Sequence, residues 1–353
     1  MEKLKRLFIS PKTSIKQSLK RMDDVAEKIL FVVGRNNAIL GVVSDGDIRR
    51  WILKGRSLAG EIRLAMNKTP VVLYKSYTIE EAKKIMVSRK IECIPIVNEK
   101  REIVSAIWWT DLFDIKPPER VKIDLPVVIM AGGEGTRLAP FTKILPKPLI
   151  PIGEKPIVEH IIDKFVECGC KKFYLSVNYK MNIIKAYFSD LKKNYEIHYI
   201  EEKKPLGTAG SIYLLKNKIK TTFCVSNCDI LINADYGDIL KFHRENGNKI
   251  TLVASMKHYT IPYGVCVLGK NGRLSSIKEK PEYDFLVNTG LYILEPEVLA
   301  DIPENRFFHI TELINLYMSR RKKIGVYPVS EKSWIDIGQW EELQETVKKF
   351  GIN

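Results

Sequence analysis

The sequence predicts a two-part α/β protein, with a mostly parallel mixed sheet in the C-terminal two thirds and a smaller, repeated α+β module before it. Three observations predict this fold class. The chain repeats itself before residue 113, strand-like and helical segments alternate beyond residue 122, and a charged, proline-containing stretch (116–122) separates the two regions. The predicted parts are two repeat copies (1–60 and 61–117), a linker (118–125) and one large domain (126–353).

The N-terminal part contains an internal repeat of 64 residues. The shift superposes Ser14 on Thr78, Met22 on Met86, Leu30 on Ile94, Ile39 on Ile103 and Asp47 on Asp111. Each copy has the pattern of a helix, two short strands and a second helix. Because units this small cannot bury an apolar face alone, we expect the two copies to pack against each other.

The C-terminal part alternates between strand and helix patterns. Runs rich in β-formers predict strands at 127–131, 173–177, 195–200, 222–227 and 251–256. Helical patterns cover 156–167, 183–192 and 210–215, and an amphipathic pattern covers 340–350. Such alternation favours a sheet with helices on both faces, and in such sheets the ligand crevice lies at the carboxyl ends of the strands.

A glycine-rich turn and two cations follow the first of these strands. Residues 127–148 read VVIMAGGEGTRLAPFTKILPKP. Glycine lets backbone N–H groups close on a phosphate that a Cβ would obstruct, and Arg137 and Lys147 add positive charge. The prolines predict an ordered, non-helical arm between the cations. The segment therefore has the features of a nucleoside triphosphate site.

This pattern, Gly-Gly-x-Gly-Thr-Arg-Leu-x-Pro-x-Thr with Lys-Pro ten residues after the arginine, resembles the sugar-1-phosphate nucleotidyltransferase family. The resemblance implies a Rossmann-like, GT-A-like domain that transfers a nucleotidyl group from an NTP to a sugar 1-phosphate. It implies catalytic roles for Arg137 and Lys147. The implied nucleotide-binding residues are Ala131, Gly132, Gly133, Gly135 and Thr136 in the loop, and Gly207 and Thr208 in the segment PLGTAG (205–210).

Two aspartates lie at predicted strand ends. Asp229 closes the run SNCD (226–229), and Asp336 lies in WIDIG (334–338). A lone aspartate in such a position is most often a turn or helix cap. The resemblance implies another role, because the family has an aspartate at both places and uses the pair to hold Mg²⁺ on the triphosphate. Mg²⁺ is therefore the expected cofactor.

The sugar side is expected in two further segments. SIKEKP (276–281) contains the Glu-Lys-Pro of the family, which implies that Glu279 accepts hydrogen bonds from sugar hydroxyls and that Lys280 meets the sugar phosphate. The segments around Gly264 and Asn288 resemble those that line the hexose pocket. Without the resemblance, Glu279 and Lys280 are equally well explained as surface charges.

Glu202 bears on the choice of base. It lies three residues before PLGTAG, where thymidylyl and uridylyl members of the family tend to have glutamine. Guanine presents two adjacent donors that one carboxylate accepts together, whereas uracil and thymine present a single N–H between carbonyls. GTP is therefore favoured over UTP, dTTP and CTP. The alternative is that Glu202 is a solvated charge in the run 201–204.

The repeated part resembles a tandem pair of CBS domains. GVVSDGDI (41–48) matches the small-apolar-apolar-Ser/Thr-x-x-Asp segment of that family. The resemblance implies a regulatory module that binds an adenosine or guanosine nucleotide through Ser44, Asp47 and Asp111. Trp108 stands where the second copy would need the equivalent of Ser44, which puts one of the two sites in doubt. The alternative is a dimerisation platform without a ligand.

The combination of a CBS pair with a guanylyl-type loop resembles bacterial glucosamine-1-phosphate guanylyltransferases of legionaminic acid synthesis. Glucosamine 1-phosphate is therefore the favoured acceptor, with mannose and heptose 1-phosphates as alternatives. The competing class is a non-catalytic, nucleotide-binding regulatory subunit. Such subunits tend to lose the arginine, the lysine or an aspartate, and this chain has Arg137, Lys147, Asp229 and Asp336.

Composition narrows the remaining classes. The net charge of +15 is spread along the chain without a nucleic-acid motif, so we expect small phosphorylated substrates rather than nucleic acid. The six cysteines form no Cys-x-x-Cys pair, and those at 93, 224 and 266 lie in apolar runs that predict buried, reduced thiols. No apolar run approaches the roughly 18 residues of a membrane helix. We expect a cytoplasmic homo-oligomer without membrane contact.

Overall fold

The computed structural model describes residues 2–89, 91–112 and 122–338. The chain forms two compact units, Met1–Glu119 and Arg120–Asn353. The helix predicted at 340–350 lies outside the described residues. None of the helices described is long and apolar enough to cross a lipid bilayer.

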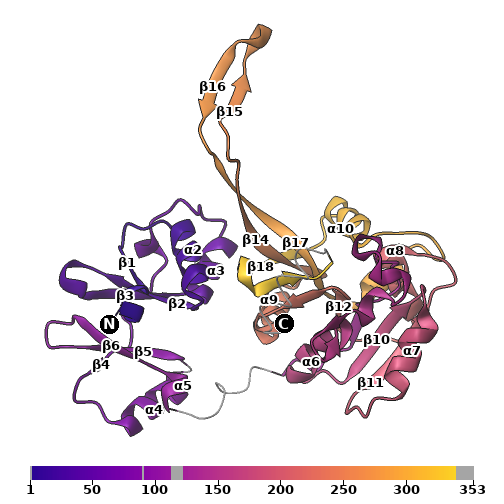
Figure 1. Ribbon diagram of the computed structural model, residues 1–353, viewed down its shortest axis with the longest axis horizontal. Helices are drawn as coiled ribbons and strands as arrows, with labels where there is room; N and C mark the ends of the chain where they lie inside the picture. The colour runs from indigo at the N-terminus through magenta and orange to yellow at the C-terminus, as the bar shows by residue number, and fades with distance from the viewer. Residues whose placement is uncertain (1, 90, 113–121, 339–353) are drawn as a thin grey trace. The chain divides into compact units, whose positions relative to one another are not determined.

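The first unit consists of two similar halves, each with a three-stranded sheet (Figure 1). In each half the first two strands are parallel and the last two are antiparallel. The first half contains α1 (Glu2–Lys5), β1 (Phe8–Ile9), α2 (Ile15–Val25), β2 (Ile29–Val33), η1 (Arg35–Asn37), β3 (Ile39–Ser44) and α3 (Asp45–Leu53). The second contains η2 (Ile62–Leu64), β4 (Leu73–Tyr74), α4 (Ile79–Arg89), β5 (Cys93–Val97), β6 (Ile103–Trp108) and α5 (Trp109–Leu112).

The two halves share a core, as the repeat predicted. Val97 and Ile103 of the second half belong to the same buried cluster as Leu30 and Val43 of the first. The backbone also connects them, since Ile39 N–H donates to the carbonyl of residue 101 at 2.9 Å. Each half thus covers the apolar face that the other half would leave in water.

The second unit is built on a seven-stranded sheet of order β11-β10-β7-β12-β17-β14-β18. Only β17 runs antiparallel to its neighbours, which confirms the mostly parallel mixed sheet. The strands are β7 (Val127–Met130), β10 (Lys172–Val177), β11 (Glu196–Glu201), β12 (Phe223–Asn227), β14 (Ile250–Thr260), β17 (Glu282–Leu294) and β18 (Ile324–Val329). The short pairs are β8 (Pro151–Ile152) with β9 (Lys155–Pro156), β13 (Ile230–Ile232) with β19 (Trp334–Asp336), and β15 (Val265–Leu268) with β16 (Leu274–Lys278).

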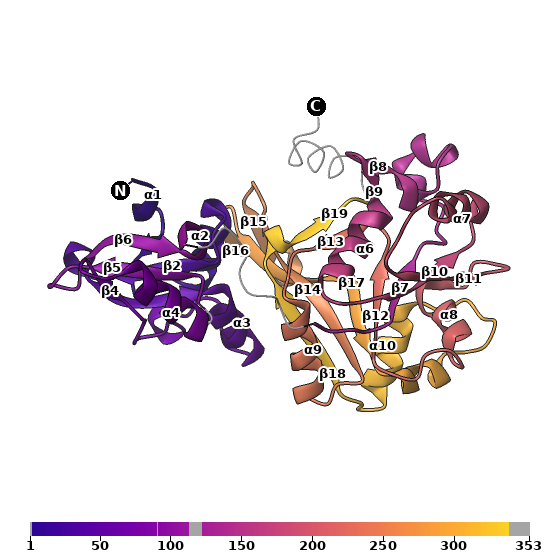
Figure 2. The same cartoon turned by 90° about the horizontal axis from the view of Figure 1, so that it is seen from below.

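Helices cover both faces of this sheet (Figure 2). One buried cluster contains Val127 and Ile129 of β7 with α6 (Ile157–Glu167), α7 (Met181–Ser189) and α9 (Tyr236–Glu245). The other contains Val128 with α8 (Gly207–Gly210), η6 (Ile212–Leu215), η8 (Pro296–Asp301) and α10 (Ile310–Ser319). Alternate residues of β7 therefore enter opposite cores, as the two-residue period of a strand requires.

Two predictions about this unit were wrong. The segment 210–215 is not one helix: α8 and η6 are short separate turns, because Gly207 and Gly210 pack against backbone. A Cβ on Gly210 would lie 2.7 Å from the carbonyl oxygen of Arg306. Cys266 is exposed rather than buried, because its strand, β15, pairs only with β16 outside the main sheet. The cysteines at 93 and 224 are buried and reduced, as predicted.

A two-stranded ribbon leaves the sheet at its carboxyl edge. The last pair between β14 and β18 is Ser255 with Val329, yet β14 and β17 continue to pair as far as Thr260 with Glu282. Figure 1 shows this extension ending in β15 and β16. We call residues 256–286 the ribbon arm. Its exposed large apolar side chains are Tyr259, Ile261, Tyr263, Val267, Leu268, Leu274, Ile277, Tyr283, Phe285 and Leu286.

Candidate active site

The glycine-rich loop begins where β7 ends, and its glycines have different surroundings. A Cβ on Gly132 would lie 2.9 Å from Glu202 Oε1. Gly135 has a φ of +66°, and a Cβ there would lie 2.8 Å from Lys147 Cβ. At Gly133, by contrast, no neighbouring heavy atom of the described residues lies within 4 Å of the Cβ position. The protein thus fills the space beside Gly132 and Gly135 and leaves the space beside Gly133 open.

The arm between the two cations contains no α-helix in the described residues 131–150, but it does contain three 3₁₀ turns. These turns are η3 (Thr136–Leu138), η4 (Phe141–Lys143) and η5 (Lys147–Leu149). Ala131, just before the loop, donates its N–H to the carbonyl of Ser176 at 2.9 Å, which ties the loop to β10. Thr136 and Arg137 lie in η3, and Lys147 opens η5.

Tyr179 and Lys180 hold this arm in place, and sequence reasoning missed both. Lys180 Nζ donates to the carbonyl oxygens of Lys143 and Ile144, at 2.9 Å for Ile144. The Tyr179 hydroxyl donates to the carbonyl oxygen of Thr142 at 3.2 Å. Both residues lie just beyond the end of β10, after Asn178. Their position after a strand that enters the crevice was the signal that could have identified them.

Two short strands bring the predicted metal aspartates together. β13 follows Asp229 and pairs antiparallel with β19, which ends in Asp336. In this pairing Ile337 N–H donates to the carbonyl of Asp229 at 2.8 Å. Lys147 Nζ donates to Asp229 Oδ2, and these two residues are only 9% and 8% exposed. The lysine of the loop segment and an aspartate 82 residues away thus form a buried ion pair.

Gly338 lies against both carboxylates and was not among the predicted site residues. A Cβ there would lie 2.5 Å from Asp229 Oδ2, 2.9 Å from Asp336 Oδ1 and 3.4 Å from Lys147 Nζ. Its N–H donates to Asp336 Oδ1 at 2.8 Å. A glycine is required at this point because any side chain would enter the space shared by the three charged groups. The glycine that follows the second aspartate in WIDIG was the available signal.

Burial raises the pKa of Asp336, and the nearby carboxylate of Asp229 raises it further. The Gly338 N–H, Lys147 and Arg137 act in the opposite direction, so Arg137 belongs to the same electrostatic environment. The buried carboxylate of Asp229, paired with Lys147, and the half-buried carboxylate of Asp336 form a hard oxygen donor set. Mg²⁺ typically binds through one or two carboxylates and completes its coordination with phosphate and water, so these residues fit the predicted ion.

Glu202 is not a solvated charge. Its Oε1 accepts from the Ser176 hydroxyl, and its Oε2 accepts from Leu206 N–H at 3.0 Å. Its backbone carbonyl accepts from Asn178 Nδ2 at 2.6 Å. Both carboxylate oxygens are therefore already engaged, and bidentate contact with guanine would have to use their remaining lone pairs.

Gly207 and Thr208 join the segment PLGTAG to the start of α10. Gly207 has a φ of +77°, and a Cβ there would lie 2.8 Å from the carbonyl oxygen of Phe308. Thr208 Oγ1 accepts from Ile310 N–H at 2.9 Å, at the first turn of α10. These contacts explain both residue types by packing and by helix capping.

The structure separates the predicted sugar-side residues into two groups. Gly264 and Glu279 lie together on the ribbon arm, where a Cβ on Gly264 would be 3.0 Å from Glu279 Oε2. Lys280 follows with a φ of +43° and is exposed. Asn288 lies further along β17, where Nδ2 donates to the Tyr292 hydroxyl at 2.7 Å. Lys280 precedes β17, and roughly 20 Å of extended strand separates Glu282, the first residue of β17, from Asn288.

In the first unit, the predicted nucleotide ligands take part in local helix caps. Ser44 caps α3, and Asp47 Oδ2 accepts from Ser44 N–H at 2.9 Å. Asp111 Oδ2 accepts from Trp108 N–H at 2.7 Å in the corresponding place of the second half. The aspartate therefore caps the helix in both halves. The first half also has a hydroxyl at this cap, that of Ser44, where the second half has Trp108.

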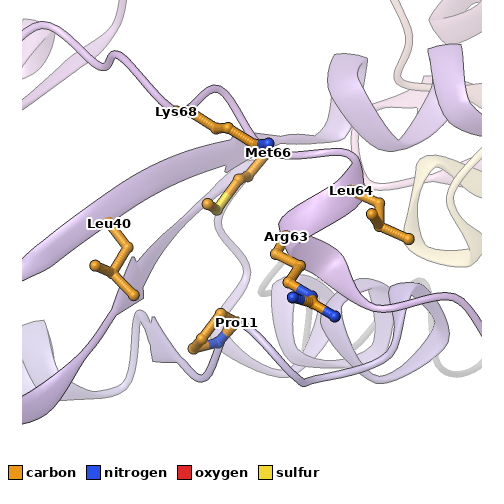
Figure 3. A pocket seen from close by; sticks show the side chains of 6 residues that line it. All are labelled: Pro11, Leu40, Arg63, Leu64, Met66 and Lys68. Atoms are coloured by element: carbon orange, nitrogen blue, oxygen red, sulfur yellow. The ribbon is translucent and has the colours of Figure 1, made fainter.

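A cavity of about 380 Å³ lies elsewhere in this unit (Figure 3). It is lined by Pro11, Leu40, Arg63, Leu64, Met66 and Lys68. Figure 3 shows the side chains of Leu40 and Met66 on one side of it and those of Arg63 and Leu64 on the other. The volume lies in the range of small-molecule sites. None of the three predicted ligands, Ser44, Asp47 and Asp111, lines it.

Comparison with known families assigns both units. The sequence profile described as "Nucleotidyl transferase" matches residues 126–351, almost the whole second unit. The chain belongs to the nucleotidyl transferase family. The profile described as "CBS domain" matches twice before it, at residues 4–54 and 59–107. This nucleotidyltransferase therefore has an N-terminal CBS pair.

The curated relatives match through the second unit. Mannose-1-phosphate guanyltransferase from Pichia angusta is 33% identical over 222 residues, which cover 60% of this chain and 60% of the relative. Bifunctional protein GlmU from Methanococcus maripaludis is 34% identical over 229 residues, which cover 62% of this chain and 53% of that relative. The nucleotidyltransferase thus spans about 60% of the length of the first of these relatives.

Solved structures match over the same part. HddC from Yersinia pseudotuberculosis, complexed with GMP-PN, has a TM-score of 0.50 and 26% identity, and the match covers 64% of this chain and 99% of HddC. A glucose-1-phosphate thymidylyltransferase from Bacillus anthracis, described as putative, has the same TM-score at 21% identity. The second of these likenesses concerns the fold alone.

Proposed function

We propose that this nucleotidyltransferase is a sugar-1-phosphate guanylyltransferase, which forms a GDP-sugar and pyrophosphate from GTP and a sugar 1-phosphate. The observation that carries the proposal is the buried pair of Lys147 and Asp229 with the half-buried Asp336 beside it, next to the glycine loop. Its donor set fits a metal-bound triphosphate. The guanyltransferase relatives and the GMP-PN complex of HddC support GTP as the donor.

The reaction we propose is an in-line displacement at the α-phosphorus of GTP. A phosphate oxygen of the sugar 1-phosphate forms the new bond, the bond to the β-phosphate bridging oxygen breaks, and pyrophosphate leaves with that oxygen. No covalent enzyme intermediate is needed, so the residues act by positioning and by neutralising charge. Arg137 and the loop amides would stabilise the departing pyrophosphate, while Lys147 and Lys280 would align the attacking phosphate.

Asp229 and Asp336 would hold Mg²⁺, which when bound neutralises charge on the phosphate oxygens. Gly338 supports this role, because its missing side chain keeps the space between the two carboxylates open. Glu279 would accept hydrogen bonds from the sugar, and Asn288 would bond a hydroxyl nearer the sheet. Glu279 lies between β16 and β17 on the ribbon arm, whereas Asn288 lies within β17 where it pairs with β14 at Ala254, so both would contact one sugar only if the ribbon arm moved toward the sheet.

The sugar is the least constrained part of the proposal. The sequence favours glucosamine 1-phosphate, and with it a role in legionaminic acid synthesis, whereas relatives such as those from Pichia angusta and Saccharomyces cerevisiae are named for mannose 1-phosphate. Mannose 1-phosphate therefore becomes an equal candidate, with heptose 1-phosphate as a third.

A panel of nucleotides and sugars tests the assignment. The purified chain is incubated with Mg²⁺, each of GTP, UTP, dTTP and CTP, and each of the three sugar 1-phosphates, and pyrophosphate release is measured. The proposal predicts the highest kcat/KM with GTP. Faster turnover of UTP or dTTP would overturn the base assignment, and no turnover with any pair would favour the non-catalytic regulatory subunit.

The CBS pair is proposed as a nucleotide-binding regulatory module. The cavity of about 380 Å³ supports this, because it combines an apolar wall at Leu40 and Met66 with the cations Arg63 and Lys68. Calorimetric titration of the full chain with AMP, ADP and GMP tests it, with Met66→Glu as the cavity variant. Binding should be lost in the variant. Absence of heat in the unaltered chain would favour the dimerisation platform.

A further inference from the structure

The buried ion pair of Lys147 and Asp229 has a consequence for how a metal enters the site. Lys147 donates to the carboxylate oxygen Oδ2 of Asp229, and the Cβ position of Gly338 lies 2.5 Å from that oxygen, 2.9 Å from Asp336 Oδ1 and 3.4 Å from Lys147 Nζ. The ammonium therefore borders the space between the two carboxylates. A divalent cation bound by both aspartates would need the same space.

We infer that Lys147 acts as a resident cation that closes the metal site of the free protein, and that a divalent ion enters only together with the triphosphate. This inference rests on the proposed role of Asp229 and Asp336 as metal ligands. It adds a function for Lys147 before catalysis, and it assigns Gly338 the task of keeping the shared space free.

Electrostatics explains why a resident cation is needed. Asp229 is only 8% exposed, and a buried carboxylate without a counter-charge is strongly destabilising. An ammonium and a divalent ion beside the same carboxylate would repel each other. One of them must leave, and lysine has a flexible stem that allows its charge to move while its backbone stays fixed in η5.

The glycine loop supplies the second position for the ammonium. The Cβ position of Gly135 lies 2.8 Å from Lys147 Cβ and 3.2 Å from Lys147 Cδ, so the lysine stem packs directly on the loop. A triphosphate bound along that loop brings several negative charges within reach of the same side chain. The ammonium can then exchange Asp229 for phosphate, and the freed carboxylate can accept the metal that arrives with the nucleotide.

Direct measurement of Mn²⁺ binding tests the exchange without an activity assay. Free Mn²⁺ is counted by its EPR signal during titration of the full chain, alone and with a non-hydrolysable GTP analogue. The unaltered chain should bind Mn²⁺ weakly alone and tightly with the analogue. Lys147→Met, which keeps the stem and removes the charge, should bind Mn²⁺ alone about tenfold more tightly or better.

Lys147→Arg is the matched control, because it keeps the charge and should keep Mn²⁺ binding weak. Circular dichroism establishes that each variant is folded. The inference also requires that the unaltered chain binds Mn²⁺ more tightly with the analogue than without it. Equal or weaker Mn²⁺ binding by folded Lys147→Met would overturn the inference, as would tight binding to the unaltered chain alone. If Asp336→Asn leaves Mn²⁺ binding with the analogue unchanged, the proposed metal ligands themselves are wrong.

Discussion

The residues proposed to hold the metal and those proposed to bind the sugar are built in opposite ways in this chain. Lys147 and Asp229 come from distant parts of the chain and meet in a buried ion pair. Glu279 and Lys280 are sequence neighbours on an exposed two-stranded ribbon. A buried group is fixed by packing, whereas an isolated hairpin is only marginally stable. We therefore expect the first group to affect folding and turnover together, and the second to affect only sugar binding.

The largest effect is expected for Asp229→Asn. The variant leaves Lys147 as a buried ammonium without its carboxylate partner, which costs about 3–5 kcal/mol of stability. Loss of the metal ligand should lower kcat by about 10²–10³-fold. Thermal unfolding and Mg²⁺-dependent pyrophosphate release measure the two effects. Glu245→Gln, on the exposed end of α9, is the control, and near-normal turnover of Asp229→Asn would remove the metal assignment.

Gly338→Ala should have the next largest effect. The added Cβ would stand 2.5 Å from one carboxylate oxygen and 2.9 Å from the other, and overpacking of this kind costs about 1–3 kcal/mol. We expect a lower kcat with little change in the KM for the sugar 1-phosphate. Gly133→Ala is the matched control for stability, because its Cβ would meet no described neighbour within 4 Å. An unchanged kcat for Gly338→Ala contradicts the shared space between the carboxylates.

Lys180→Met tests the support of the loop arm. The ammonium bonds the carbonyls of Lys143 and Ile144, and hydrogen bonds from charged groups contribute about 1.5–3 kcal/mol. We expect a higher KM for GTP and a lower melting temperature. Lys185→Met removes one exposed ion pair, with Glu201, outside the loop arm and should change each value less. Equal effects of the two variants would mean that Lys180 does not hold the loop arm in place.

The smallest effect on stability is expected on the ribbon arm. Lys280→Met alters an exposed side chain, so the free energy of unfolding should stay within about 0.5 kcal/mol. The KM for the sugar 1-phosphate should nevertheless rise, by about tenfold for one lost charged contact to phosphate. Steady-state kinetics at saturating GTP measures this. A large loss of stability would show that the ribbon arm is part of the folded core. Lys280 and Asp229 would then not differ in their effect on stability.

Local sequence patterns were sufficient for the fold class, and the motif around the glycine loop was sufficient for the family of the second unit. The strands at 127–131 and 173–177 are signals that act over a few residues, and the repeat of the N-terminal part is visible when the sequence is compared with itself. The same patterns failed at 210–215 and at Cys266. At 210–215 the backbone of Arg306 packs against Gly210, and this contact is distant in sequence. Cys266 is exposed because its strand, β15, pairs with β16 outside the main sheet.

The sheet, the glycine loop and the charged residues of the candidate site could be read from the sequence alone. Which of these residues meet is visible only in the folded chain: Lys147 with Asp229, Asp229 with Asp336 through β13 and β19, and Lys180 with the loop arm. The tertiary structure also engaged both oxygens of Glu202 and placed Glu279 on a ribbon arm. The reason is physical, since an ion pair depends on which strand edges pair, and that choice is made by the whole packed core rather than by neighbouring residues.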